Sequence, residues 1–449
     1  MKRLFKSTVA TFLAMIMMLS MIIPVMATEQ QTPDISEWAI EALHEGEKFG
    51  IFPMEWYYDG FRSEIPLEKL ETLLSLTEEK IAALNLEKNK NYKPVSYEGD
   101  NSRGDIINRL YNIVAQYDLP VGNTAVDYLK ERKVLRGSSK GLQLEKSATT
   151  EQAVILAVRL VKDTYHLAQQ GGKGVAWVVE NDDTVVYLLG SIHVGISELY
   201  PFNEKLLAAF NQSDALLVEA NLYDSEGIQY LIEKAMYQEG TTIKDAVSEE
   251  AYAKIEKVAQ KHNLPLEQLI MQKPWTLSST LSGLSLSEFF GSSVEEMNNY
   301  GVDNYFLLNA LLQEKPIIEL EGIKTQVDMF EGLSPEGQED YLVETLDSIL
   351  EPNEESQYEL IQDWFNHWKN GDIEGFAKSM QVIEGEPSEF NKALIGVRDE
   401  KMAEKIMALL EDKEKGTYFV VVGSAHFLVD KTIRYHLEEN GYDVKPFYQ

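Results

Sequence analysis

Two apolar runs in the second half of the chain end in the same short polar motif. Residues 184–189 (Thr-Val-Val-Tyr-Leu-Leu) continue into 190–193 (Gly-Ser-Ile-His), and residues 418–422 (Tyr-Phe-Val-Val-Val) continue into 423–426 (Gly-Ser-Ala-His). Their length and β-branched content predict two buried strands, and each glycine permits a tight turn directly after its strand. Because open α/β sheets bind ligands outside the carboxyl ends of their strands, we expect both imidazoles at a binding site.

The repetition of this motif is more informative than either copy. With 28 Gly and 7 His in the chain, one Gly-x-x-His is expected by chance roughly 0.4 times. Two copies that share a serine and both follow an apolar run are a far rarer coincidence. The alternative for either histidine alone is a turn-capping or packed side chain, and the pair favours a functional role.

Three more apolar runs complete the predicted sheet. Residues 175–179 are predicted to pair with the first run across an Asn-Asp-Asp turn as a β-hairpin. Residues 215–218 end at Glu219, and residues 316–320 end at Glu321. A carboxylate that closes a buried strand is costly without a partner, so each glutamate is a candidate site residue. A helix N-cap or a structural salt bridge is the alternative.

The segments between these runs have a helical period. Residues 225–300 are predicted to be mainly helical, and Arg398 opens a helix that continues over residues 401–410. The long acidic stretch at residues 334–380 is predicted to be a solvated face or a lid rather than a site. Strands that alternate with helices indicate an α/β fold with a central mixed β-sheet flanked by helices.

The first third of the chain lacks a strand pattern and carries a weak internal repeat with a spacing of about 84 residues. Each copy predicts a helix, a glycine-bearing turn and a second, capped helix, over residues 38–74 and 125–157. Thr149 or Thr150 is the candidate N-cap of the last of these helices. The pattern predicts a small all-α domain of two repeats.

Three segments follow from this organisation. Residues 1–27 begin with basic residues, continue with an uncharged apolar stretch and end at the small residue Ala27, which predicts a cleaved signal peptide. An uncleaved membrane anchor is the alternative. The glycine-rich residues 169–174 mark the boundary between the all-α domain, expected at residues 28–170, and the α/β domain, expected at residues 171–449.

Charge and cysteine content narrow the classes of function. The formal net charge of −32 argues against binding to nucleic acid or to anionic lipid surfaces. The sequence has no cysteine, which excludes disulfide bonds and thiol chemistry. Together with the predicted leader, this composition indicates a secreted or cell-surface bacterial protein.

Four predicted strands therefore end in His193, Glu219, Glu321 and His426. Two imidazoles and two carboxylates are sufficient to bind Zn²⁺, Mn²⁺ or Co²⁺ with one coordination position left open. The sequence thus predicts a divalent metal site at the carboxyl edge of the sheet.

Several short motifs resemble the TraB/GumN family, which includes the Tiki proteases. In chain order they are residues 189–195 (Leu-Gly-Ser-Ile-His-Val-Gly), 218–219 (Val-Glu), 301–303 (Gly-Val-Asp), 320–321 (Leu-Glu), Arg398 and 423–426. The resemblance covers residues 175–449. It implies an α/β sheet with helices on both faces and a metal-dependent peptidase site built by the two Gly-x-x-His motifs. Asp399 stands where that family usually has Asn.

The repeats within residues 34–166 resemble the S-layer homology module, whose repeats anchor exported bacterial proteins to cell-wall polymers. The family's Thr-Arg-Ala-Glu signature is degenerate here, as Pro66–Lys69 and Thr149–Gln152. A cell-wall polymer is therefore an expected partner of this region, and a plain helical packing domain is the alternative.

These observations lead to one principal functional hypothesis, a secreted metal-dependent hydrolase that acts as a peptidase on peptides or proteins. His193, His426 and Glu219 would hold the divalent metal, with Glu219 or Glu321 as general base. Arg398 would stabilise the developing oxyanion. One alternative is a metal-free esterase-type hydrolase in which a histidine is the general base. The other is a non-catalytic protein that binds a peptide signal.

Overall fold

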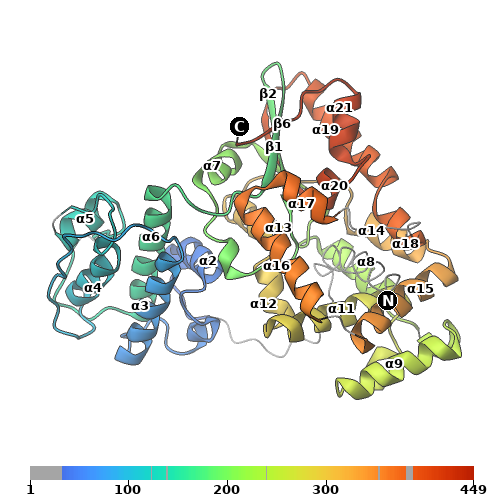
Figure 1. The fold of residues 1–449 in the computed structure, drawn as a ribbon, viewed down its shortest axis with the longest axis horizontal. Helices are drawn as coiled ribbons and strands as arrows, with labels where there is room; N and C mark the ends of the chain where they lie inside the picture. The colour runs from blue at the N-terminus through green and yellow to red at the C-terminus, as the bar shows by residue number, and fades with distance from the viewer. Residues whose placement is uncertain are drawn as a thin grey trace. The chain divides into compact units, whose positions relative to one another are not determined.

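The chain is described by a computed structural model over residues 33–122, 124–137, 140–238, 240–351, 354–380 and 388–448. The predicted signal peptide lies outside the described residues. Two compact units are present (Figure 1). The helical unit comprises the described residues up to Gly172 together with Ile196–Leu207, and the α/β unit comprises Lys173–Gly195 and the described residues from Ala208. Over the described ranges, no helix combines the length and hydrophobicity that crossing a bilayer requires.

Over its described residues, the helical unit contains five α-helices and two short 3-10 helices before the sheet begins. These are η2 (Glu37–Ala39), α2 (Ile40–Phe49), η3 (Met54–Tyr58), α3 (Leu67–Ala82), α4 (Arg103–Ala115), α5 (Ala125–Glu131) and α6 (Thr150–Leu167). The first predicted copy of the repeat corresponds to α2 and α3, and the second to α5 and α6. The loops that precede α3 and α6 pair with each other, since the Ile65 N–H donates to the Ala148 carbonyl at 2.9 Å. Thr149 caps α6 in a capping box with Gln152, as the sequence predicts.

Helix α4 lies between the two copies and was not predicted from the repeat. Its signal is nevertheless present, because Ile106, Leu110 and Val114 recur with a spacing of four and are all fully buried. Ser102 caps the helix by accepting from the Asp105 N–H. The helical unit thus has one more core helix than the repeat alone implies.

The α/β unit is built on one six-stranded sheet. Its strands are β1 (Val175–Asn181), β2 (Thr184–Ser191), β3 (Ala215–Val218), β4 (Ile317–Glu319), β5 (Thr417–Gly423) and β6 (Lys445–Pro446), in the order β4-β3-β5-β2-β1-β6. Strands β4, β3, β5 and β2 are parallel neighbours, and β1 pairs antiparallel with β2 and β6. The predicted mixed sheet and hairpin are therefore confirmed. The two-residue edge strand β6 was not predicted, because a run this short has no period.

Helices flank this sheet. Helix α19 (Val397–Glu411) packs on β1 and β2, whereas α13 (Val302–Leu312) packs on β3 and β5. The rings of Phe306 of α13 and Phe419 of β5 pack at a tilt with centroids 5.0 Å apart, and those of Trp177 of β1 and Phe427 lie 5.4 Å apart. The helices from α7 onward are α7 (Glu204–Gln212), α8 (Ser225–Ala235), α9 (Glu249–Lys261), α10 (Leu266–Leu269), α11 (Pro274–Phe290), α12 (Val294–Asn299), α13 (Val302–Leu312), α14 (Ile323–Glu331), α15 (Pro335–Leu350), α16 (Glu354–Asn370), α17 (Ile373–Met380), α18 (Glu389–Leu394), α19 (Val397–Glu411), α20 (Ala425–Leu428) and α21 (Ile433–Glu439). Two further 3-10 turns are η4 (Ser197–Leu199) and η5 (Ile243–Asp245).

The acidic stretch at residues 334–380 differs in part from the predicted solvated face or lid. It is helical, as α15, α16 and α17, and its acidic residues are largely solvent-exposed as predicted, but its other side packs into the core. Trp364 and Trp368 are almost fully buried, and the Trp368 indole N–H donates to the Gly190 carbonyl at 2.6 Å. Acidic residues cover the outer side of these helices, while aromatic residues at a helical spacing form the inner side.

Candidate functional site

Parallel pairing brings the four predicted site residues to one edge of the sheet. Strands β4, β3, β5 and β2 lie next to one another in that order, so their carboxyl ends present Glu321, Glu219, His426 and His193 in the same order. Ser191 at the end of β2 pairs with Gly423 at the end of β5. The two Gly-Ser-x-His motifs therefore lie side by side on adjacent strands, offset by one residue.

Each histidine is oriented by a buried aspartate. His193 Nδ1 lies 2.7 Å from Asp303 Oδ2, and His426 Nδ1 lies 2.8 Å from Asp399 Oδ1. A carboxylate only accepts hydrogen bonds, so Nδ1 carries the proton in both rings. This leaves Nε2 of each neutral ring with a free lone pair, the arrangement found in metal-ligating histidines.

Both Nε2 atoms are buried and have no hydrogen-bond partner among the described residues. Buried polar atoms in folded proteins are almost always satisfied, so this pair requires an explanation. The space beside them is narrow. A methyl group at Gly423 would lie 3.1 Å from His193 Nε2 and 3.2 Å from Glu219 Oε1. Gly423 thus lets an imidazole and a carboxylate approach the same point.

The two glutamates have different surroundings. Glu321 forms a two-point ion pair with Arg398, with its carboxylate oxygens 2.7 Å from Nε and 2.5 Å from Nη2. Glu219 accepts from the Gly423 N–H at 2.6 Å, and its other oxygen lies 3.8 Å from His426 Nε2 and 3.6 Å from Arg398 Nη2. Glu219 therefore stands between the histidine pair and the guanidinium, whereas Glu321 holds Arg398 in place.

Negative charge predominates at this site. Four carboxylates are largely buried here: Glu219 and Glu321 contact the guanidinium of Arg398, whereas Asp303 and Asp399 contact the two histidines. Such an excess is unfavourable in a low dielectric and favours the uptake of positive charge. Protonation of both imidazoles would supply two positive charges. One divalent cation bound to two neutral imidazoles would supply the same two charges.

The pKa values of the two histidines and of Glu321 reflect this excess of negative charge and the position of Arg398. Burial opposes a charge on His193, but the adjacent Asp303 and the nearby Glu219 outweigh it and raise the pKa of His193 to about 9. Burial also opposes a charge on His426, and Asp399 and Glu219 again raise its pKa. Burial alone would raise the pKa of Glu321, but the contact with Arg398 holds it below its ordinary value. Glu321 is therefore a stable anion.

The profile of the TraB/PrgY/gumN family matches residues 175–446, which include this site and more than half of the chain. The chain belongs to the TraB/PrgY/gumN family. The family match begins at the first residue of β1 and ends in β6, so it spans the whole sheet. The resemblance inferred from the motifs is thus confirmed for this family; the comparisons give no support for the S-layer homology module.

Two kinds of curated relative are similar to the chain. Uncharacterized protein YbaP of Escherichia coli (strain K12) is 26% identical over 244 residues, which is 54% of this chain and 83% of the relative. Metalloprotease TIKI2 of Xenopus tropicalis is 22% identical over 320 residues, and metalloprotease TIKI1 of Danio rerio is 23% identical over 314 residues. The alignments with these two metalloproteases span 60% and 62% of their own length. No solved structure matches the chain.

The donor set fits a divalent cation in its chemistry. His193 and His426 present unpartnered Nε2 atoms, and Glu219 lies beside both. In the part of the chain that the structure describes, however, no three His, Asp or Glu side chains converge as a ready-made metal cluster. Glu219 is instead engaged by the Gly423 N–H and by the Gln326 amide at 3.3 Å.

Sequence reasoning did not assign the two aspartates that orient the histidines. Asp303 was visible in the Gly-Val-Asp motif but received no role, and Asp399 was noted only because it replaces the usual Asn. Asp399 is fully buried against His426. The signal for both was a carboxylate in the first turn of a helix, next to a motif residue, which occurs too often to indicate a partner.

Proposed function

We propose that the chain is a metal-dependent hydrolase that acts as a peptidase on peptides or proteins. The observation that carries this proposal is the pair of buried, unpartnered Nε2 atoms on His193 and His426, each in a ring whose Nδ1 is held by a buried aspartate. The similarity to the two Tiki metalloproteases supports the same reaction class. The leader expected at residues 1–27 supports a secreted or cell-surface location.

His193, His426 and Glu219 would hold the divalent cation. When bound, such a cation polarises a carbonyl and lowers the pKa of a water molecule toward neutrality. Asp303 and Asp399 keep the two rings in the tautomer that presents Nε2. Their role is positioning, since both lie behind the imidazoles.

Arg398 supplies the positive charge for the developing oxyanion. Its guanidinium is fixed by Glu321 and by the Leu394 carbonyl at 3.0 Å, while its Nη2 group also faces Glu219. Because the pKa of Glu321 is lowered, this carboxylate stays ionised and serves to orient Arg398 rather than to transfer protons. Glu219, which lies between Arg398 and the histidines, is then either the third ligand or, with the cation on the two histidines alone, the group that transfers the proton.

The raised pKa of His193 argues against a metal-free mechanism at neutral pH. A ring with a pKa of about 9 is protonated at pH 7 and has no lone pair with which to act as general base. A divalent cation held by His193 Nε2 would take the place of this proton. The metal-dependent hydrolase is therefore the better match to the site.

The test is cleavage of a defined peptide library by the full chain, followed by mass spectrometry. Chelation with EDTA should abolish cleavage, and Mn²⁺, Co²⁺ or Zn²⁺ should restore it. His193→Ala should lose both metal content and cleavage, whereas His436→Ala, at a histidine outside the site, should keep both. Cleavage that is indifferent to chelation would contradict the metal, and a peptide recovered intact but bound after long incubation would identify a binding protein.

A further inference from the structure

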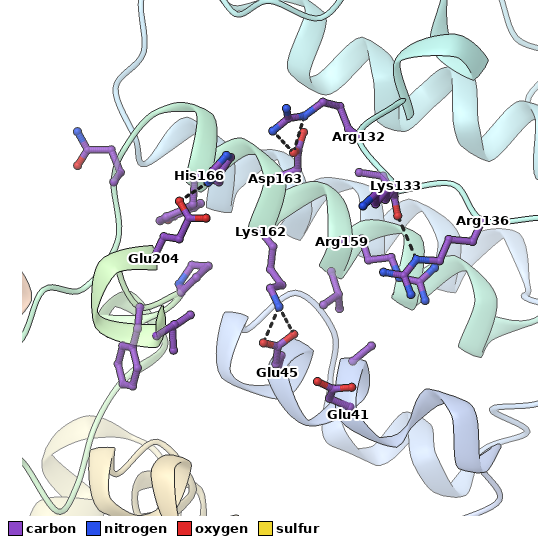
Figure 2. Close-up of a pocket in the computed structure, with 18 of the residues that line it drawn as sticks. Glu41, Glu45, Arg132, Lys133, Arg136, Arg159, Lys162, Asp163, His166 and Glu204 are labelled. Atoms are coloured by element: carbon purple, nitrogen blue, oxygen red, sulfur yellow. Dashed lines mark hydrogen bonds and ion pairs between the residues drawn. The ribbon is translucent and has the colours of Figure 1, made fainter. Parts of the chain in front are cut away.

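The helical unit contains a cavity of about 360 Å³ that is independent of the histidine pair. Helix α6 forms one wall, and α2, the turn that follows α5 and residues 201–207 form the others (Figure 2). This volume is within the range of small-ligand sites. All of its lining residues belong to the helical unit.

Most charged side chains around this cavity are already paired. Arg132 contacts Asp163 at 2.6 Å, Lys162 contacts Glu45 at 2.6 Å, and His166 contacts Glu204 at 2.5 Å. These contacts use three of the four carboxylates that line the cavity. They bring opposite charges together and leave no net demand for a counter-ion.

Two arginines are among the charged side chains that remain without an ion pair. Arg159, half-buried on α6, forms no hydrogen bond or ion pair with any residue that the structure describes. Arg136 donates only its Nε–H, to the Lys133 carbonyl at 3.3 Å, so its terminal nitrogens are free. Figure 2 shows the two guanidinium groups next to each other. Burial and the charge of Arg136 both lower the pKa of Arg159, as expected for two like charges in contact.

This arrangement is unusual for such an acidic chain. The protein has 73 acidic and 41 basic residues, yet the remaining carboxylate of the cavity, Glu41, is exposed and forms no ion pair within the described ranges. Lys133 adds a third cation at the same wall. Like charges that are partly removed from water repel each other unless an anion lies between them.

We propose that this cavity binds a small organic oxyanion, with its carboxylate or phosphate group between Arg136 and Arg159. Planar guanidinium groups bind such oxyanions through paired hydrogen bonds, and two of them can hold one group from both sides. The body of the ligand would lie against Val134 and Val158, and the exposed indole of Trp38 at the cavity would cover it. The cavity is larger than a bare inorganic ion would fill, so it has room for the organic part of a ligand.

The test is isothermal titration calorimetry of the full, metal-free chain at low ionic strength with phenyl phosphate, benzoate and inorganic phosphate. We expect saturable binding of phenyl phosphate or benzoate at one site per chain. Tighter binding of phenyl phosphate identifies a phosphate ester as the preferred class, and tighter binding of benzoate identifies a carboxylate. Affinity should fall as salt is added, because the contacts are charged.

Arg159→Gln should weaken binding about 10- to 100-fold, the loss of one charge-assisted pair, and Arg136→Gln, at an exposed position, should do the same. The matched control is Arg62→Gln, which removes the same charge from an exposed ion pair outside the cavity. The unliganded Tm of Arg159→Gln should equal or exceed that of the wild type, since repulsion is relieved; a structural role would lower it. Binding of no probe, or equal binding by Arg159→Gln and Arg62→Gln, would overturn the proposal.

Discussion

Ser424 donates both its backbone N–H and its hydroxyl to the carbonyl oxygen of Ser191, at 2.9 and 2.8 Å. The Ser191 hydroxyl in turn donates to Asp303 at 2.7 Å, and Asp303 holds His193. The two serines therefore have different roles. Ser424 links the two motifs by hydrogen bonds, and the hydroxyl of Ser191 orients Asp303 behind His193.

From this connection we predict that His193 and His426 act as one unit. If both bind one cation, His193→Ala and His426→Ala should each abolish metal binding, and the double variant should be scarcely worse than either single variant. Activity and metal content should be compared with those of His436→Ala, with folding checked by circular dichroism. Multiplicative losses, as expected of independent sites, or full metal occupancy in His426→Ala, would show that the histidines do not share a site.

Gly423→Ala should reduce activity strongly without unfolding the chain. The added methyl group would lie 3.1 Å from His193 Nε2 and 3.2 Å from Glu219 Oε1, closer than ordinary van der Waals contact. It would push the imidazole and the carboxylate apart, and a displacement of 1 Å at reacting groups can cost about 10²-fold in rate. The matched control is Gly137→Ala, where the nearest atom is 3.5 Å from the new methyl group. Equal activity of the two variants would mean that Gly423 does not shape the site.

Trp368→Phe should destabilise the α/β unit more than Trp364→Phe does. Both indoles are buried, but only the Trp368 N–H has a partner, the Gly190 carbonyl at 2.6 Å, while the Trp364 N–H has none among the described residues. The difference should be about 1 kcal/mol, the net contribution of one hydrogen bond. Thermal unfolding of both variants measures it. A Trp364→Phe variant that is equally or more destabilised would contradict this assignment.

In the metal-free protein, stability should fall as the pH rises toward 9. The pKa of His193 is raised from about 6.5 in the unfolded chain to about 9 in the folded one. The folded state therefore binds this proton more tightly, and the stabilisation is fully present below pH 6.5 and lost as the pH rises through 9. Its size is on the order of 3 kcal/mol.

The measurement is the Tm of chelated protein between pH 6 and pH 10, with His193→Gln as the comparison. The wild type should lose more of its Tm than the variant over this range, because the variant has no proton to release at this position. Added Mn²⁺ or Co²⁺ should flatten the wild-type profile, since a cation replaces the proton. Identical profiles of wild type and variant would show that the pKa of His193 is not raised.

The local pattern of the sequence determined the strands and where their functional residues stand. β-Branched runs predict β2 and β5 because such side chains favour extended backbone, and the glycine that ends each run places a histidine just beyond it. Two further apolar runs end at Glu219 and Glu321. The sequence therefore indicates that His193, Glu219, Glu321 and His426 all lie at strand ends. These features depend on neighbours within a few residues, so they can be read without knowing the fold.

The tertiary structure alone decided which side chains act on which. Asp303 lies 110 residues from His193, and Arg398 lies 77 residues from the Glu321 that fixes it. The tertiary structure also decided the place of Trp368. This residue lies in a stretch whose charge suggested a solvated lid, yet its indole N–H donates to the Gly190 carbonyl in the core. Composition reports an average over both sides of a helix, whereas burial depends on which side meets the core. Partner choice between distant residues is set by strand order and helix packing, and no local period of the sequence encodes it.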